Sequence, residues 1–410
     1  MFPATSGFSP TCAMLTDASS HRSGVLHDES NGGNDPRGNN GHSGGRSTAG
    51  GVALRVELDV QPEASAAAAE HVHAENEANF TGEKLITDSI AQLLHQSVWI
   101  ALLSMWATAL RLSLIWLGDY PSLLLPGVVW AQFIGCLMLG FLSEDTALFY
   151  KGRSKYEALY LGLTSGFCGS LTTFSAWALD TYEAAANVEG AQRNGGYNVL
   201  AALAQLLLTL AVAVAAFRVG NHAGILFAQL PPRQQLRFVL LRPRSNSVSL
   251  VSAIGFMVVV QLGGVLAGAI LLPSWRGRGS IALLLAPLGA LLRWQLGSRL
   301  NARITGFPLG TFSANMLASL VEAVAYMLQH HVQDSHTSCA VLQGIQDGFC
   351  GTLSTLSTFA LELCTLKLMH AYLYGTASVV VAVTICVLVA GTDFWLQGGA
   401  HSDANRICGY

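Results

Sequence analysis

The chain divides into a polar front and a long series of apolar runs. Residues 1–85 are rich in Gly, Ser, Asn and His, whereas apolar stretches follow one another over the remainder. Because a bilayer core of about 30 Å needs roughly 20 apolar residues per helix, each run predicts one membrane-spanning helix. The predicted spans are residues 97–118, 121–143, 156–182, 196–218, 249–272, 279–300, 308–329, 341–367 and 372–395.

The composition supports an all-α polytopic membrane protein. Only 11% of the residues are charged and 51% are hydrophobic, with a net charge of −3. A soluble domain carries about 25% charged residues, so a soluble enzyme with one core is excluded. A nucleic-acid binder is excluded as well, because it would need a basic patch. The polar front cannot bury enough apolar surface to fold, which predicts disorder.

Charges in the connections predict an orientation. Basic residues gather in two loops, at residues 151–155 and 233–244. Cytoplasmic loops carry an excess of Lys and Arg, which places the N-terminus in the cytoplasm. With nine spans, the C-terminus then lies outside.

An internal repeat organises the apolar region. GFCGSLTTFSAWALD (166–180) aligns without gaps with GFCGTLSTLSTFALE (348–362). The flanking segments align Arg111 with Arg293 and Gln132 with Asn315. Each repeat therefore has four helices, and the single helix between them makes the second repeat cross the membrane in the opposite sense.

This organisation predicts five segments along the chain. They are a disordered cytoplasmic region (1–90), a first channel repeat (91–220), a basic loop with an inverting linker helix (221–278), a second channel repeat (279–396) and a short C-terminal tail (397–410).

The repeated motif is unusual for a membrane helix. Glycines and hydroxyl residues interrupt the apolar run in mid-span, and freed backbone at that depth is tolerated only inside protein or beside a wet cavity. Two facing breaks would direct carbonyl oxygens at a common centre, which suits a dehydrated Na⁺. The alternative is that Gly and Ser only allow close helix packing.

These motifs resemble the fluoride-channel family, called Fluc or CrcB in bacteria and FEX in its fused eukaryotic form, whose bacterial pattern is close to GFCGGLTTFSTF. The resemblance covers about residues 97–395. It implies an antiparallel pair of units that encloses two fluoride pathways, here within a single chain. It also implies passive, fluoride-selective export across the plasma membrane, with fluoride and the lipid bilayer as partners, no nucleic acid and no enzymatic activity.

The resemblance carries roles onto particular residues. It implies a central structural Na⁺ held by backbone carbonyls of Gly169, Ser170, Gly351 and Thr352. It matches Phe174 and Phe359 with the aromatic positions of the anion path, Asn315 with the pore Asn, and Arg111 and Arg293 with the first-helix Arg. A dry fluoride pore must replace water with neutral donors, and the side chains available are those of Asn315, Ser175, Ser357 and Thr358.

The two repeats differ at the pore positions. Trp177 and Leu356 stand at the other two aromatic positions, and Gln132 replaces the pore Asn in the first repeat. One hypothesis is that the path with Phe174 and Phe359 conducts while the other is vestigial. The alternative is that both conduct, because Leu and Trp can also line a pore.

Two other functions compete with a channel. A gradient-coupled transporter of another small anion or substrate would need a carboxylate in mid-span. Asp180 and Glu362 are predicted nearer a helix end, and Glu322 occurs in one repeat alone. An intramembrane enzyme would need a catalytic dyad, and no His is predicted in mid-span.

Overall fold

The computed structural model describes residues 62–118, 125–144, 153–188, 194–229, 278–332 and 336–396, with scattered positions between 255 and 266. The predicted linker helix at 249–272 lies mostly outside the described residues, as do residues 1–61 and the tail at 397–410. The chain forms two compact units, residues 1–89 and 90–410, and the candidate site belongs to the second.

Helix α1 (Pro62–Leu117) begins much earlier than the first predicted span. The helix thus covers residues 62–90 of the region, residues 1–90, for which the sequence predicts disorder. Pro is favoured in the first turn of a helix, and the Ala-rich run that follows has the highest intrinsic helix propensity. Only residues 89–117 of this helix are apolar enough to cross a membrane.

Both repeats show the same order of elements: two helices, a broken helix and a final helix. In the first repeat, α2 (Gly127–Ser143) follows α1, and α7 (Gly195–Ala228) ends the repeat. Between them lies the broken segment, which consists of α4 (Arg153–Leu161), η1 (Gly162–Cys168), α5 (Gly169–Leu171) and α6 (Ser175–Ala186). The second repeat begins with α10 (Arg278–Leu300) and α11 (Leu309–His331). Its broken segment consists of α12 (His336–Gly344), η4 (Ile345–Cys350), α13 (Gly351–Leu353) and α14 (Leu356–Thr365). The final helix consists of α15 (Leu368–Cys386), η5 (Val387–Gly391) and α16 (Thr392–Leu396). The segments η1, η4 and η5 are π-helical.

Five helices of the described residues are long and apolar enough to span a membrane. They are residues 89–117, 195–228, 279–300, 309–331 and 368–396, and α2 is a shorter apolar helix. Each broken segment consists of helical pieces that are individually short. The chain is thus an all-helical, multi-pass membrane protein.

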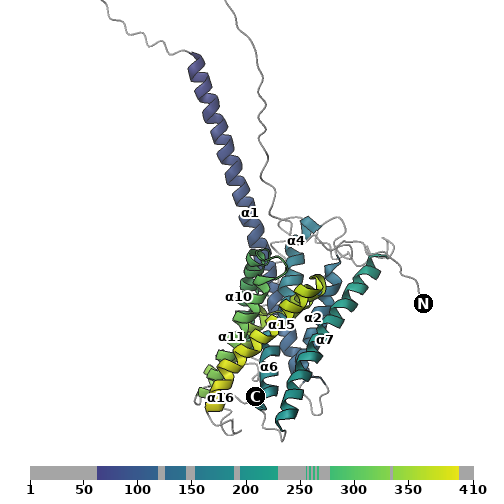
Figure 1. The fold of residues 1–410 in the computed structure, drawn as a ribbon. Helices are drawn as coiled ribbons and strands as arrows, with labels where there is room; N and C mark the ends of the chain where they lie inside the picture. Colours follow the sequence, from purple (N-terminus) through teal and green to yellow (C-terminus); the bar gives the residue numbers. More distant parts are fainter. Residues whose placement is uncertain are drawn as a thin grey trace, which may run out of the picture. The chain divides into compact units, whose positions relative to one another are not determined.

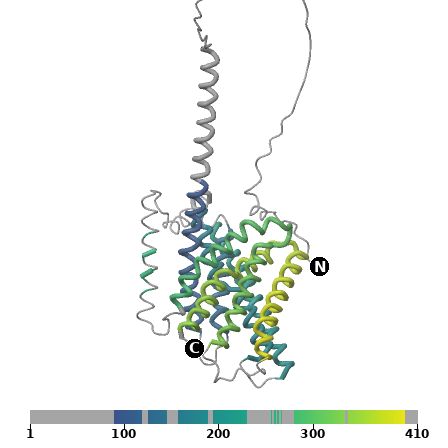
Figure 2. The backbone as a smooth tube through the Cα atoms, turned by 90° about the vertical axis from the view of Figure 1, so that its left-hand side faces the viewer, coloured from purple at the N-terminus to yellow at the C-terminus, as the bar shows by residue number. Residues whose placement is uncertain are grey.

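The helices of the second unit lie side by side in one bundle (Figure 1), which Figure 2 shows from a perpendicular direction. The last pieces of the two broken helices each pack against helices of both repeats. Helix α6 packs against α7 and also against α11 and α15, while α14 packs against α15 and also against α2 and α7. Each repeat therefore completes the helix packing of the other.

Glycines allow α2 and α7 to approach closely. A Cβ atom at Gly140 would overlap the backbone carbonyl of Phe217, and one at Gly220 would overlap that of Leu137. Helices in lipid have no hydrophobic driving force for association, so the close van der Waals packing that small residues allow stabilises such crossings.

We expect Gly140→Ala and Gly220→Ala each to lower the melting temperature of the detergent-purified protein, because the added methyl group overpacks the crossing by about 1–3 kcal/mol. Gly195→Ala is the control, since a methyl group at that position would meet no heavy atom within 4 Å. Equal melting temperatures for all three variants in a thermal-shift assay would contradict this packing role.

Candidate functional site

Both broken helices stop at equivalent positions of the repeated motif. Thr172 and Ser354 adopt extended backbone conformations, and helices α6 and α14 begin at Ser175 and Leu356. The predicted mid-span break is confirmed. It lies after the motif glycines and not at them, because Gly169 and its neighbours form a helical turn.

Two buried arginines connect the breaks. Arg111 is 2% exposed and Arg293 is 5% exposed. Nη1 of Arg111 donates to the carbonyl of Ser170 at 2.9 Å and to that of Gly351 at 2.5 Å, and its Nη2 donates to the carbonyl of Asp347. Arg111 therefore holds the carbonyls of both repeats.

Arg293 makes the equivalent contacts from the second repeat. Its Nη1 donates to the carbonyls of Gly169 at 2.8 Å, Ser354 at 3.1 Å and Thr352. Its Nη2 donates to the carbonyl of Ser165. The two guanidinium groups thus satisfy carbonyls that the helix breaks release, which a membrane interior requires.

The motif glycines make room for these guanidinium groups. A Cβ atom at Gly169 would lie 2.5 Å from Nη2 of Arg293, and one at Gly351 would overlap Nη2 of Arg111. The prediction that these glycines themselves break the helix is wrong, because their missing side chains serve the close approach of an arginine.

The amide side chains hold the backbone of each break. Gln132 accepts the N–H of Thr173 at 3.2 Å and donates to its carbonyl at 2.6 Å. Asn315 accepts the N–H of Thr355 at 2.9 Å, while its own amide nitrogen lies 3.5 Å from the Thr355 carbonyl. Asn315, predicted as a pore donor, therefore also stabilises the break, and it holds the carbonyl more loosely than Gln132 does.

Hydroxyl groups from both repeats meet between the breaks. The Oγ atoms of Ser175 and Ser354 are 2.9 Å apart, and Thr172 Oγ1 and Ser357 Oγ are 3.0 Å apart. These two pairs are equivalent under the repeat alignment. Each of the predicted donors Ser175 and Ser357 thus contacts a hydroxyl of the opposite repeat, whereas Thr358 contacts Thr355 in its own repeat.

The predicted aromatic pair is in contact. The rings of Phe174 and Phe359 are fully buried, with centroids 5.1 Å apart at an interplanar angle of 71°. Trp177 packs on Phe174 at 5.3 Å and Tyr374 packs on Phe359 at 5.3 Å. Leu356 is buried in the same apolar cluster.

Two buried carboxylates lie close to this aromatic cluster. Glu362 accepts hydrogen bonds from Thr311 Oγ1 and from the Tyr374 hydroxyl, both at 2.6 Å. Glu322 accepts one from Ser175 Oγ at 2.5 Å. Sequence reasoning missed Thr311, although its position one helical turn before Asn315 places both on one face of α11.

The inner face of α11 forms a polar stripe. Thr311, Asn315, Ser319 and Glu322 follow one another at helical spacing, and all four are buried. The repeat alignment gives α2 a less polar face at the same positions. Those residues are Val128, Gln132, Cys136 and Leu139. The two halves of the structure are therefore alike in backbone and unlike in lining.

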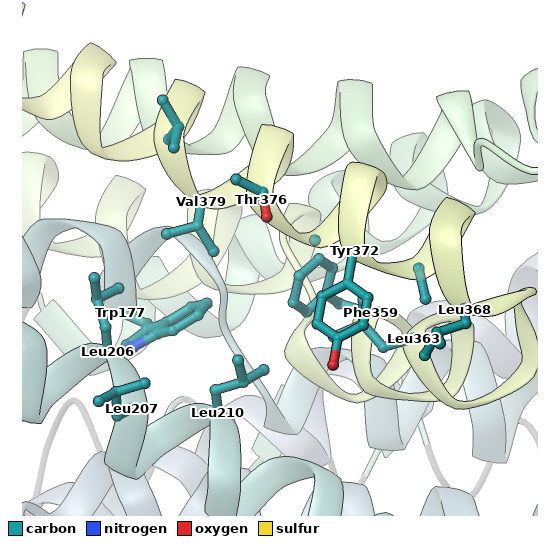
Figure 3. A pocket seen from close by; sticks show the side chains of 13 residues that line it. Trp177, Leu206, Leu207, Leu210, Phe359, Leu363, Leu368, Tyr372, Thr376 and Val379 are labelled. Atoms are coloured by element: carbon teal, nitrogen blue, oxygen red, sulfur yellow. The ribbon is translucent and has the colours of Figure 1, made fainter.

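A cavity of about 410 Å³ opens between α7 and α15. Figure 3 shows Trp177 with the leucines of α7 at one end and Phe359 with Tyr372 and Leu363 at the other. Its lining is almost entirely apolar, so the cavity resembles a lipid environment and not a hydrated anion vestibule.

The central carbonyls do not offer a free metal site. Those of Gly169, Ser170, Gly351 and Thr352, predicted to hold Na⁺, each accept an N–H from Arg111 or Arg293. A cation at the same oxygens would stand against two guanidinium charges. Within the described parts of the chain, no three His, Cys, Asp or Glu side chains form a metal-binding group either.

Comparison with known proteins agrees with this duplicated architecture. The profile of the CrcB-like protein family, described as Camphor Resistance (CrcB), matches twice, at residues 98–220 and 280–392. A multi-pass membrane protein with two such regions defines the class, and the chain belongs to the CrcB-like family.

Its relatives include fungal and bacterial proteins. Fluoride export protein 1 of Neurospora crassa is 34% identical over 82% of this chain and 73% of its own length. Fluoride export protein 1 of Schizosaccharomyces pombe is 34% identical over 75% of this chain and 98% of its own. The fluoride-specific ion channel FluC of Nitrosomonas europaea is 36% identical over 27% of this chain and 88% of its own. These are channels and exporters, not enzymes, and no solved structure matches the chain.

We expect Arg111→Lys and Arg293→Lys to destabilise the protein strongly. Lysine keeps the charge but cannot form the forked contacts, and each lost charged hydrogen bond costs about 1.5–3 kcal/mol. Size-exclusion chromatography and thermal unfolding should show aggregation or a large fall in melting temperature. Arg299→Lys is the matched control, because Arg299 is exposed and lies on α10, the helix that also holds Arg293. Stable, monodisperse Arg111→Lys protein would refute the role given to this contact.

Proposed function

We propose that the chain is a passive, fluoride-selective anion channel that exports cytoplasmic fluoride and so protects against its toxicity. The polar stripe on α11 is the observation that carries the proposal, because its Glu322 contacts Ser175, next to Phe174, and because α2 has no equal to it. The names of the relatives point to the same anion.

The lining suits a small, strongly hydrated anion. Hydroxyl and amide groups of Thr311, Asn315 and Ser175 can replace the water of fluoride with neutral donors. The edges of Phe174 and Phe359 add the positive rims of aromatic rings. Neutral donors bind weakly enough to release the anion, which conduction requires.

The proposed topology is a pair of inverted four-helix repeats joined by a linker helix, giving nine spans. The contacts of α6 and α14 with both repeats and the crossed contacts of Arg111 and Arg293 support two equivalent halves that face each other. In this proposal one chain takes the place of an antiparallel dimer. It lies in the plasma membrane with its N-terminal region in the cytoplasm and its C-terminus outside.

A single conducting pathway fits the lining better than two conducting pathways. The second pathway would draw on Trp177, Gln132 and Leu356, and the repeat alignment adds the apolar positions Val128 and Leu139 to it. A path so poor in donors would not replace the hydration of fluoride. We therefore infer that it is vestigial.

A gradient-coupled transporter remains the second candidate. The observation in its favour is that Glu322 and Glu362 are both buried and hydrogen-bonded near the aromatic pair, and buried carboxylates can carry protons in transporters.

A structural Na⁺ stays a prediction of the family resemblance. The arrangement of the carbonyls does not fit it, since Arg111 and Arg293 already supply positive charge there.

Fluoride efflux from proteoliposomes should therefore proceed without a proton gradient and with N-methyl-D-glucamine in place of Na⁺. The melting temperature should also be the same in both cations, because the guanidinium groups replace the metal. A strict need for a gradient at unchanged stability would favour the transporter. A fall in melting temperature without Na⁺ would favour the structural ion.

Substitutions of the aromatic positions separate one pathway from two. Phe174→Ile and Phe359→Ile should each abolish fluoride efflux, because they remove the ring edges from the proposed pathway. Leu356→Ala and Trp177→Ala, at the repeat-equivalent positions, should retain most of the efflux. Equal loss from all four variants would rule out a single conducting pathway.

A further inference from the structure

The carboxylate of Glu322 lies at the end of a chain of hydrogen-bond donors at the start of α6. The backbone N–H groups of Phe174 and Ser175 both donate to Ser354 Oγ, at 3.1 and 3.2 Å. Ser354 Oγ is 2.9 Å from Ser175 Oγ, and Ser175 Oγ donates to Glu322 at 2.5 Å. Since Ser175 donates to a carboxylate oxygen, the donors at this point converge on an acidic side chain.

The equivalent place in the other half has no acid. Ser357 is the repeat equivalent of Ser175, and its hydroxyl donates to the carbonyl of Cys168 at 3.2 Å. Leu139 stands where Glu322 stands. The same break therefore forms in the other half without a carboxylate, so Glu322 is not needed to build it.

A second hydroxyl donor, that of Ser319, lies near Glu322 on the same face of α11. Ser319 lies one turn before Glu322 on α11, is fully buried, and its hydroxyl has no hydrogen-bond partner among the described residues. Asn315 lies one further turn away on the same face. An anion that moves along this face would meet the amide of Asn315, then the hydroxyl of Ser319, and then the Ser175 hydroxyl that Glu322 occupies.

We propose that Glu322 is a tethered competitor of the permeant anion, and that its carboxylate and fluoride alternate at the Ser175 hydroxyl. The inference rests on the proposed function, since it places Glu322 in the fluoride pathway. One hydroxyl proton cannot serve both anions, and their like charges repel. The competition keeps fluoride from binding too tightly to leave.

Glu322→Gln tests this role because the amide keeps the shape and still accepts from Ser175 but has no charge. The half-saturating internal fluoride concentration for efflux from proteoliposomes should fall roughly tenfold, because the repulsion is removed. Leu139→Gln places the same group at the equivalent position of α2 and should leave that concentration unchanged.

A readout that does not depend on transport accompanies the flux assay. A ligand that binds the folded state raises the melting temperature with its occupancy. At equal fluoride concentration, the fluoride-dependent rise should be larger for Glu322→Gln than for the unsubstituted protein, with Leu139→Gln as the control.

An unchanged or raised half-saturating concentration in folded Glu322→Gln protein would overturn the proposal. Loss of efflux in that variant would also overturn it, because Glu322 would then be required for transport. If the unsubstituted protein fails to transport fluoride, the proposed function fails. The melting-temperature titration then decides alone, since a larger rise supports competition and an equal rise refutes it.

Discussion

The hydrogen bonds between two buried guanidinium groups and the carbonyls of two helix breaks hold the centre of this protein together. Each component is unfavourable alone in a membrane, since a charge loses its hydration and a broken helix leaves carbonyls without donors. Arg111 and Arg293 bring donors to those carbonyls, and each reaches across to the opposite repeat. The charge and the breaks thus stabilise each other, and both depend on glycines that leave space for the guanidinium planes.

The remaining features of the site follow from this centre. Helices α6 and α14 each contact both repeats, which brings Phe174 against Phe359 and sets hydroxyl pairs from different repeats within hydrogen-bonding distance. The amides of Gln132 and Asn315 then hold the extended backbone beside each break. On this shared frame the side chains of α11 and α2 differ, so the two halves are alike in backbone and unlike in the polar groups that they present.

Much of this arrangement could be predicted from the repeat. The ungapped match of the two motifs paired Arg111 with Arg293 and Gln132 with Asn315, and it indicated broken helices. The partners of the arginines could not be predicted, because backbone carbonyls leave no mark in residue identity. The Thr311–Glu362–Tyr374 contacts were missed for a similar reason, since they join three helices. Helix α1 begins well before the predicted span because an Ala-rich run precedes it, and such a polar run lacks the apolar pattern by which spans are found.

The unequal faces of α11 and α2 have a consequence for how such a protein can change over time. In a pair of identical subunits, every substitution alters both halves at once, so a residue must suit the frame and the pathway together. A duplicated chain separates these demands. Leu139 can remain a packing residue while its counterpart Glu322 acquires a carboxyl group. Linking the two repeats in one chain therefore allows one repeat to specialise while the other maintains the shared architecture.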